Sequence, residues 1–106
     1  MQQGVPAGVA KRIVNRPVVI IQDDRFDATD SVTVCAFTTD PTEAPLIRLL
    51  IVPDDQNRLR VASSLMVDKI TTVPRSKLRE RIGRLADQDM VRLGRAVVVF
   101  FGLAGS

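Results

Sequence analysis

The sequence predicts a mainly β fold, a small and strongly curved sheet or barrel, with one helix packed on it at the C-terminal end. Short β-branched segments separated by turn signals run through most of the 106 residues. Apolar residues then recur at helical spacing from Asp87 onward. A length of 106 residues with 45% hydrophobic and 25% charged side chains is typical of one globular domain, spanning residues 1–106.

Five or six segments have the composition of strands. Residues 17–22 read PVVIIQ, with proline at the first position, where a missing N–H is tolerated. Residues 32–38 are apolar on both faces, which predicts a central strand. The other expected strands are residues 46–52, 60–67, 69–73 and 79–85, and the middle two could be one strand with an irregularity at Asp68. Residues 11–15 form a short strand or a lead-in, and residues 1–10 are expected to be loosely attached.

The C-terminal segment favours a helix that begins with an aspartate N-cap at Asp87 and ends at a Gly102 C-cap. Its apolar residues are Met90, Leu93, Val97, Phe100 and Phe101. The β-branched run at residues 97–99 would also suit a strand.

The chain has no histidine and a single cysteine, Cys35. One cysteine cannot form an internal disulfide, and without histidine it cannot build a structural zinc site. The missing histidine also excludes Ser-His-Asp and Cys-His nucleophiles and every histidine-ligated metal. Any catalysis must therefore use arginine, lysine, carboxylates or hydroxyls.

No segment has the 18 or so consecutive apolar residues of a membrane span, and the N-terminus lacks the apolar core of a signal peptide. A lone cysteine fits a reducing compartment. We therefore expect a cytoplasmic protein that makes no contact with a membrane.

Positive charge is concentrated near the C-terminus. Residues 1–74 carry 8 basic and 9 acidic side chains, whereas residues 75–95 carry 7 basic and 3 acidic ones. Arg75, Lys77, Arg79, Arg81 and Arg84 stand at alternating or near-alternating positions, so on an extended strand several of their side chains would share one face and suit phosphate contacts. A solvated face without a ligand, or a surface for an acidic protein, would have the same pattern.

Three stretches, in this order, carry a resemblance to one family: RPVVII at residues 16–21, VCAFTTD at 34–40 and VDKITTVPRSKL at 67–78. RIGRL and the terminal helix follow them. Each stretch is short, but their order and spacing together resemble toxins of the MazF/PemK (Kid) type from bacterial toxin–antitoxin pairs. The resemblance covers about residues 15–104.

The resemblance implies an SH3-like barrel of the CcdB/MazF/PemK type that works as a homodimer. It implies a sequence-specific, ribosome-independent endoribonuclease that cuts single-stranded RNA, such as mRNA, and leaves 2′,3′-cyclic phosphate and 5′-hydroxyl ends. This chemistry needs no metal and no cofactor, so the absence of histidine is no obstacle. The implied protein partner is a cognate antitoxin, acidic and partly disordered, that blocks the RNA groove.

The family's catalytic arginine directly precedes the proline that opens the second strand and corresponds to Arg16; its catalytic threonine ends the next strand and corresponds to Thr38. A guanidinium and a hydroxyl can stabilise the negative charge that builds when a ribose 2′-oxygen attacks the adjacent phosphate. Arg16 could also protonate the leaving 5′-oxygen. Without the resemblance, Arg16 would be expected to pair with Asp23 or Asp24.

The expected RNA-binding residues are Thr39, Asp68, Lys69 and Arg75. Asp68 matches a position where the family has an acidic residue near the RNA, and it could accept a hydrogen bond from a base edge or orient Arg16. It could equally be an irregular strand residue held by backbone N–H groups. Lys69 and Arg75 would contact phosphates.

The first fifteen residues depart from the family, whose members begin with a strand resembling RGEIW and then a glycine-rich loop that covers the active site. This chain has MQQGVPAGVAKRIVN there, so the first strand is either replaced by residues 11–15 or missing. A missing strand would expose a sheet edge and remove one wall of the RNA groove. Two alternatives stay open: a degenerate member that binds antitoxin without cutting RNA, and a CcdB-like gyrase poison, against which the small C-terminal residues GLAGS argue.

Overall fold

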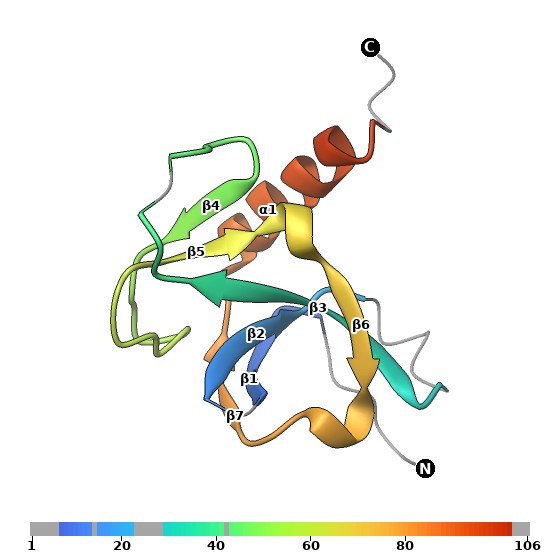
Figure 1. Cartoon of the computed structure of the whole chain (residues 1–106). Coiled ribbons are helices and arrows are strands. Elements are labelled where there is room, and N and C mark those ends of the chain that lie inside the picture. The colour runs from blue at the N-terminus through green and yellow to red at the C-terminus, as the bar shows by residue number, and fades with distance from the viewer. Residues whose placement is uncertain (1–6, 14, 23–28, 42, 103–106) are drawn as a thin grey trace.

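The computed structural model describes residues 7–13, 15–22, 29–41 and 43–102. Within these ranges the chain forms seven strands and one α-helix (Figure 1). The strands are β1 (Val9–Ile13), β2 (Arg16–Ile20), β3 (Ser31–Thr38), β4 (Arg48–Ile51), β5 (Ser63–Met66), β6 (Thr71–Pro74) and β7 (Arg81–Arg84). Helix α1 (Asp87–Phe100) comes last, and the 3₁₀ turns η2 (Val67–Lys69) and η3 (Arg75–Lys77) flank β6. The predicted mainly β fold with a C-terminal helix is confirmed.

Strand β3 is the centre of the sheet, because three other strands pair with it, all antiparallel. Strand β2 lies along one edge, while β6 pairs with the beginning of the other edge and β5 with its end. The sheet order runs β4-β5-β3-β2-β1-β7, with β6 on β3 beside that path. Because β5 and β6 divide one edge of β3 between them, the sheet bends away in two directions (Figure 1).

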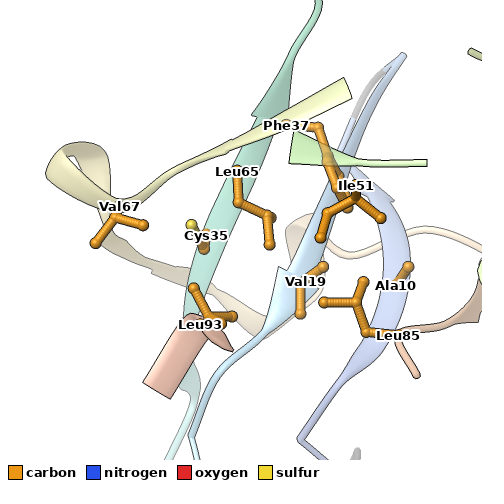
Figure 2. Packing of buried hydrophobic residues seen from close by; sticks show 9 residues of the cluster. All are labelled: Ala10, Val19, Cys35, Phe37, Ile51, Leu65, Val67, Leu85 and Leu93. Carbon is orange, nitrogen blue, oxygen red and sulfur yellow. The ribbon is translucent and has the colours of Figure 1, made fainter. Parts of the chain in front are cut away.

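Alternating side chains bury both faces of the inner strands. One cluster packs under helix α1 and contains Ala10, Val19, Cys35, Phe37, Ile51, Leu65, Val67, Leu85 and Leu93 (Figure 2). A second cluster contains Val9, Val18, Ile20, Val32 and Val34. Neighbouring residues of the same strand thus enter different clusters, which confirms the expectation that residues 32–38 form a central strand.

The start of the chain is held more firmly than the sequence suggests. Val9 and Ala10 are buried, and β1 pairs with β2 on one edge and β7 on the other. The first strand is therefore present, two residues earlier than the expected 11–15, and the expectation of a loose start is wrong for Val9 and Ala10. Residues 1–6 lie outside the described residues. A strand with only two small buried residues has a weak hydrophobic pattern in the sequence. Pairing with β2 and β7 provides stability that this pattern does not indicate.

Turns shorten the strands expected from composition. Residues 45–47 form a turn, so the strand expected at 46–52 begins at Arg48. The turn η2 separates β5 from β6, so residues 60–67 and 69–73 contain two strands rather than one.

The basic segment does not form one extended face, contrary to expectation. Arg75 and Lys77 lie in η3, where the N–H of Leu78 donates to the Arg75 carbonyl at 3.1 Å and closes a tight turn. Strand β7 begins only at Arg81. The basic side chains therefore point from different backbone elements.

The expected helix is present, but its caps differ from those expected. The N-cap is Ala86, without a side-chain hydrogen bond, and Asp87 is the first helical residue, where its charge still favours the positive end of the helix dipole. The C-cap is Phe101, and Gly102 follows with φ 70°, the left-handed conformation that commonly ends a helix. Val97 packs against the core, which keeps the β-branched run helical.

The loop between β4 and β5 is built around a buried asparagine. The Oδ1 atom of Asn57 accepts the N–H groups of Asp54 at 3.1 Å and Leu59 at 3.0 Å, and its Nδ2 donates to the Val52 carbonyl at 3.0 Å. Strand β7 passes so close to this loop that a Cβ on Gly83 would lie 2.5 Å from the Gln56 carbonyl oxygen. The absence of a side chain at Gly83 therefore lets the loop and β7 touch.

Two glycine substitutions should shift stability in opposite directions. Gly83→Ala would force backbone apart and should lower the free energy of unfolding by at least about 2 kcal/mol. Gly94→Ala, inside α1 with no heavy atom within 4 Å of the added Cβ, should raise it by about 1 kcal/mol. Urea unfolding followed by circular dichroism compares the two variants with the wild type. A Gly83→Ala protein as stable as the wild type would contradict the close approach.

The buried thiol of Cys35 should make stability fall at alkaline pH. Burial, and then the charge of Asp68, raise the pKa of Cys35 from 9.0 to about 12. The folded state thus holds the proton when the unfolded thiol has already lost it, so this contribution is complete below pH 9.0 and is lost as pH rises toward 12. The slope reaches about 1.4 kcal/mol per pH unit. Urea unfolding at pH 8 to 11 should show a steeper decline for the wild type than for Cys35→Ala, and equal declines would contradict it.

Candidate functional site

The candidate site lies where β2 begins and β3 ends. The two strands are antiparallel, with Val18 opposite Ala36, and continuing this register places Arg16 opposite Thr38. The two residues expected to be catalytic are 22 positions apart in the sequence, yet the pairing of their strands brings both to one pocket.

A pocket of about 230 Å³ occupies this position. It is lined by Arg16, Pro17, Phe37, Thr38, Thr39 and Ser63. The structure therefore brings together three of the residues singled out in the sequence, Arg16, Thr38 and Thr39. No carboxylate is among the described residues that line the pocket, so an anion would meet no repulsion from its walls.

Arg16 and Thr38 both line the pocket and can donate hydrogen bonds to a ligand. Arg16 is exposed, and in the described ranges its side chain makes no ion pair; Asp23 and Asp24, its alternative partners, lie outside those ranges. The Oγ1 atom of Thr38 accepts the N–H of Asp40 at 3.1 Å. Because this bond uses a lone pair of the hydroxyl oxygen, the O–H of Thr38 stays available for a ligand.

Ser63 is a pocket residue that the sequence did not reveal. It opens β5, which pairs with the end of β3, and it is buried. Its hydroxyl donates to the Val61 carbonyl at 3.0 Å. A serine in the stretch RVASSLM has no distinctive spacing, and only the pairing of β5 with β3 brings it to the pocket.

The other expected RNA-binding residues do not line this pocket. Asp68 lies in η2 and forms an ion pair and hydrogen bond with Arg48 of β4, and both side chains are largely shielded from solvent. The expected contact of Asp68 with Arg16 is therefore replaced by an ion pair with Arg48. Lys69 is exposed in the same turn.

Arg75 lies at the far end of β3 from Thr38. Its guanidinium donates to the backbone carbonyls of Thr29, at 3.1 Å, and Ser31, at 3.3 Å. These bonds join η3 to the beginning of β3, so Arg75 supports the fold there.

The pocket is part of a longer depression. A neighbouring hollow of about 240 Å³ shares Thr38, Thr39 and Ser63 with it, and another of about 260 Å³ shares Pro17, Thr39 and Ser63. Together they form a continuous depression that crosses the end of the sheet, which suits an extended polymer better than a small molecule.

The glycine-rich loop implied by the family resemblance has no counterpart between β1 and β2. Only Val14 and Asn15 separate the two strands, and Ile13 pairs directly with Arg16. A connection of two residues leaves no room for a glycine-rich loop between these strands.

The described residues hold no cluster of three or more histidine, cysteine, aspartate or glutamate side chains that could bind a metal ion. Within the same ranges, no helix has both the length and the apolar character needed to span a bilayer. A guanidinium and a hydroxyl facing one open pocket are suited to stabilising negative charge that develops on a phosphoryl group.

Comparisons with known proteins show the family of this chain. Residues 6–101 match the family described as PemK-like, MazF-like toxin of type II toxin–antitoxin system. The match begins before β1, so it includes the strand that the sequence left uncertain. A probable endoribonuclease MazF of Mycolicibacterium smegmatis is 63% identical over 90 residues, which cover 85% of this chain and 83% of the relative.

Solved structures of MazF proteins share the fold. The Mycobacterium tuberculosis toxin MazF-mt6 aligns with a TM-score of 0.75 and 25% identity over 92% of this chain and 97% of that one. A MazE–MazF structure from Deinococcus radiodurans aligns with a TM-score of 0.78, but at 14% identity over 94% and 98% it supports the fold alone. The expected CcdB/MazF/PemK-like fold is confirmed. The chain belongs to the PemK-like, MazF-like toxins of type II toxin–antitoxin systems.

Proposed function

We propose that this toxin is an endoribonuclease that cuts single-stranded RNA, mRNA included, in the pocket of Arg16 and Thr38, without a ribosome or a metal. The observation that carries the proposal is the register that places these two donors at one open pocket. Endoribonuclease activity is further supported by the names of two relatives, the M. smegmatis protein and an endoribonuclease MazF of Staphylococcus saprophyticus that is 28% identical over 89 residues.

The proposed reaction is an in-line displacement at phosphorus. The ribose 2′-oxygen attacks the adjacent phosphorus, the bond to the 5′-oxygen breaks, and a 2′,3′-cyclic phosphate and a 5′-hydroxyl result. Arg16 and Thr38 donate hydrogen bonds to the phosphoryl oxygens, where negative charge accumulates. Arg16 also supplies the proton to the leaving 5′-oxygen. Because a guanidinium is a poor base, the proton of the attacking 2′-hydroxyl goes to water, and Arg16 regains its own proton from water.

Thr39 lines the same pocket, and we assign it to binding the nucleotides beside the cut. RNA binding by Asp68, Lys69 and Arg75 stays a prediction. Asp68 and Arg75 already have protein partners, so any contact with RNA at these positions would lie outside the pocket.

Antitoxin binding and dimerisation complete the proposal. Membership of a toxin–antitoxin family implies a cognate antitoxin, which we expect to be acidic because it has to compete with RNA. The end of α1 exposes large apolar side chains at Val98, Val99, Phe100 and Phe101. We propose that a second copy of the chain covers them. The cytoplasm, where mRNA is found, is the proposed location.

Cleavage should persist in EDTA and depend on Arg16. With a long RNA as substrate, the wild type should make discrete cuts, and Arg16→Ala should lower the rate constant on the order of 100- to 1000-fold, because a preorganised donor to the developing charge is lost. Thr38→Ala should lose less, since a neutral hydroxyl is a weaker donor. The pH–rate profile should lack an inflection near about 6.5, because the chain has no histidine.

The matched control is Arg95→Ala, which removes an exposed arginine of α1 and should cut like the wild type. The proposal is wrong if discrete cuts fail to appear in EDTA or survive Arg16→Ala. An inert protein that still binds its antitoxin would identify a degenerate member of the family, and an inert protein that inhibits gyrase would identify a CcdB-like poison.

The apolar end of α1 should set the oligomeric state. We expect the wild type to sediment as a dimer at micromolar concentration, and Val99→Ser combined with Phe101→Ser to sediment as a monomer with an unchanged circular dichroism spectrum. Both side chains are more than half exposed, at 54% and 56%, so the substitutions leave the core intact. A monomeric wild type, or a dimeric double variant, would rule out this interface.

A further inference from the structure

We propose that the depression beside the catalytic pocket is a second RNA subsite, in which Arg12, Arg58 and Arg60 bind backbone phosphates of the strand that is being cut. This inference rests on the proposed function and extends it. The subsite has a volume of about 260 Å³ and shares Pro17, Thr39 and Ser63 with the catalytic pocket.

The charged residues that line this subsite are all basic. Three arginines line it, and no carboxylate does so among the described residues. Arg12 is balanced in part by Glu80, whose carboxylate lies 3.1 Å from Nε. Arg58 and Arg60 make no ion pair in the described part of the chain. Unpaired guanidinium groups on the wall of an open depression are the groups that bind phosphate best.

The backbone at Arg58 has an unusual conformation. Its φ is 56°, and no other non-glycine residue in the described ranges has a positive φ. Glycine and asparagine adopt this conformation readily, whereas in an arginine it causes steric strain. Arg58 lines the depression beside the catalytic pocket, so an arginine kept at this strained position is consistent with a need for its guanidinium there.

The loop that carries the two arginines is rigid before any ligand binds. Asn57, next to Arg58, is fully buried and ties the loop to the Val52 carbonyl at 3.0 Å. The N–H of Arg84 donates to the Gln56 carbonyl at 2.9 Å, which fastens the loop to β7. A preorganised pair of donors loses little conformational entropy when it binds.

The two acidic residues of the same loop, Asp54 and Asp55, do not line the depression. Asp54 uses its carboxylate to accept the N–H groups of Gln56 at 2.9 Å and Asn57 at 2.6 Å, and it does not line the subsite. Its negative charge therefore stabilises the loop and leaves the arginines free for an external anion.

An RNA strand fits this arrangement better than an acidic protein segment. The subsite joins the catalytic pocket through Thr39 and Ser63, so a polymer held by Arg58 and Arg60 continues directly to Arg16. A nucleic acid strand carries one negative charge at every nucleotide, and it can place neighbouring phosphates in both hollows at once.

Binding can be tested without cleavage. The probe is a labelled, mixed-sequence single-stranded RNA pool in which every 2′-oxygen is methylated, so that it binds but cannot attack its own phosphate. Fluorescence anisotropy at several salt concentrations gives the dissociation constant and its salt dependence. Arg58→Gly and Arg60→Ala should each weaken binding about tenfold and reduce the logarithmic salt slope by about 0.7, the value for one phosphate contact.

The readouts separate an RNA contact from a structural role. Arg58→Gly should melt at the same or a higher temperature than the wild type, because glycine relieves the strained φ, yet it should bind RNA more weakly. Arg95→Ala removes the same charge from exposed α1 and should change neither affinity nor slope. Relative to the wild type, Arg16→Ala should lose much less affinity for the pool than it loses in the rate of cutting a natural RNA.

The proposal is overturned if Arg58→Gly and Arg60→Ala bind the pool as the wild type does, or no more weakly than Arg95→Ala. It is also overturned if these variants lose affinity for the antitoxin alone, since the arginines would then serve the protein partner. Failure of the nuclease proposal is recognised separately: the wild type would bind the pool, with the same dependence on Arg58 and Arg60, but would leave natural RNA uncut.

Discussion

The structure depends on the pairing and burial of strand β3. Its residues enter both apolar clusters. Moving the strand by one residue would place each side chain on the opposite face and disrupt the packing of both clusters. Its register against β2 is therefore strongly determined. Continuing that register places Thr38 opposite Arg16, so the geometry of the candidate site depends on the packing of the core.

The same strand also explains why the site is open. β3 ends at Thr38, where β5 has just joined its edge, and β2 begins at Arg16. Side chains at such strand ends have no further strand to cover them. Two residues connect β1 and β2, and the anchored β4–β5 loop lines the depression beside the pocket. The candidate site is consequently an open depression lined by cationic groups, which suits the charge stabilisation that we propose for it.

Local patterns in the sequence predicted much of this arrangement, but unevenly. The alternation of residues 32–38 and the helical spacing after Asp87 gave the central strand and the helix, because each pattern reflects burial of one or two faces. Strand β1 was underestimated, since its stability comes from neighbours far along the chain. The prediction of one extended basic face is wrong because η3 turns the backbone at Arg75, and a periodic pattern in the sequence does not indicate a single turn of this kind.

The sequence by itself determined the class of fold and the chemistry left open by the absence of histidine, because these follow from composition and periodicity, and its resemblance to one toxin family singled out Arg16, Thr38 and Thr39 as candidate site residues. Only the tertiary structure decided that Ser63 joins them, that Asp68 pairs with Arg48, and that Arg58 and Arg60 border the pocket. These residues meet through strand pairing and a tightly bonded loop, which bring together positions that no local pattern connects.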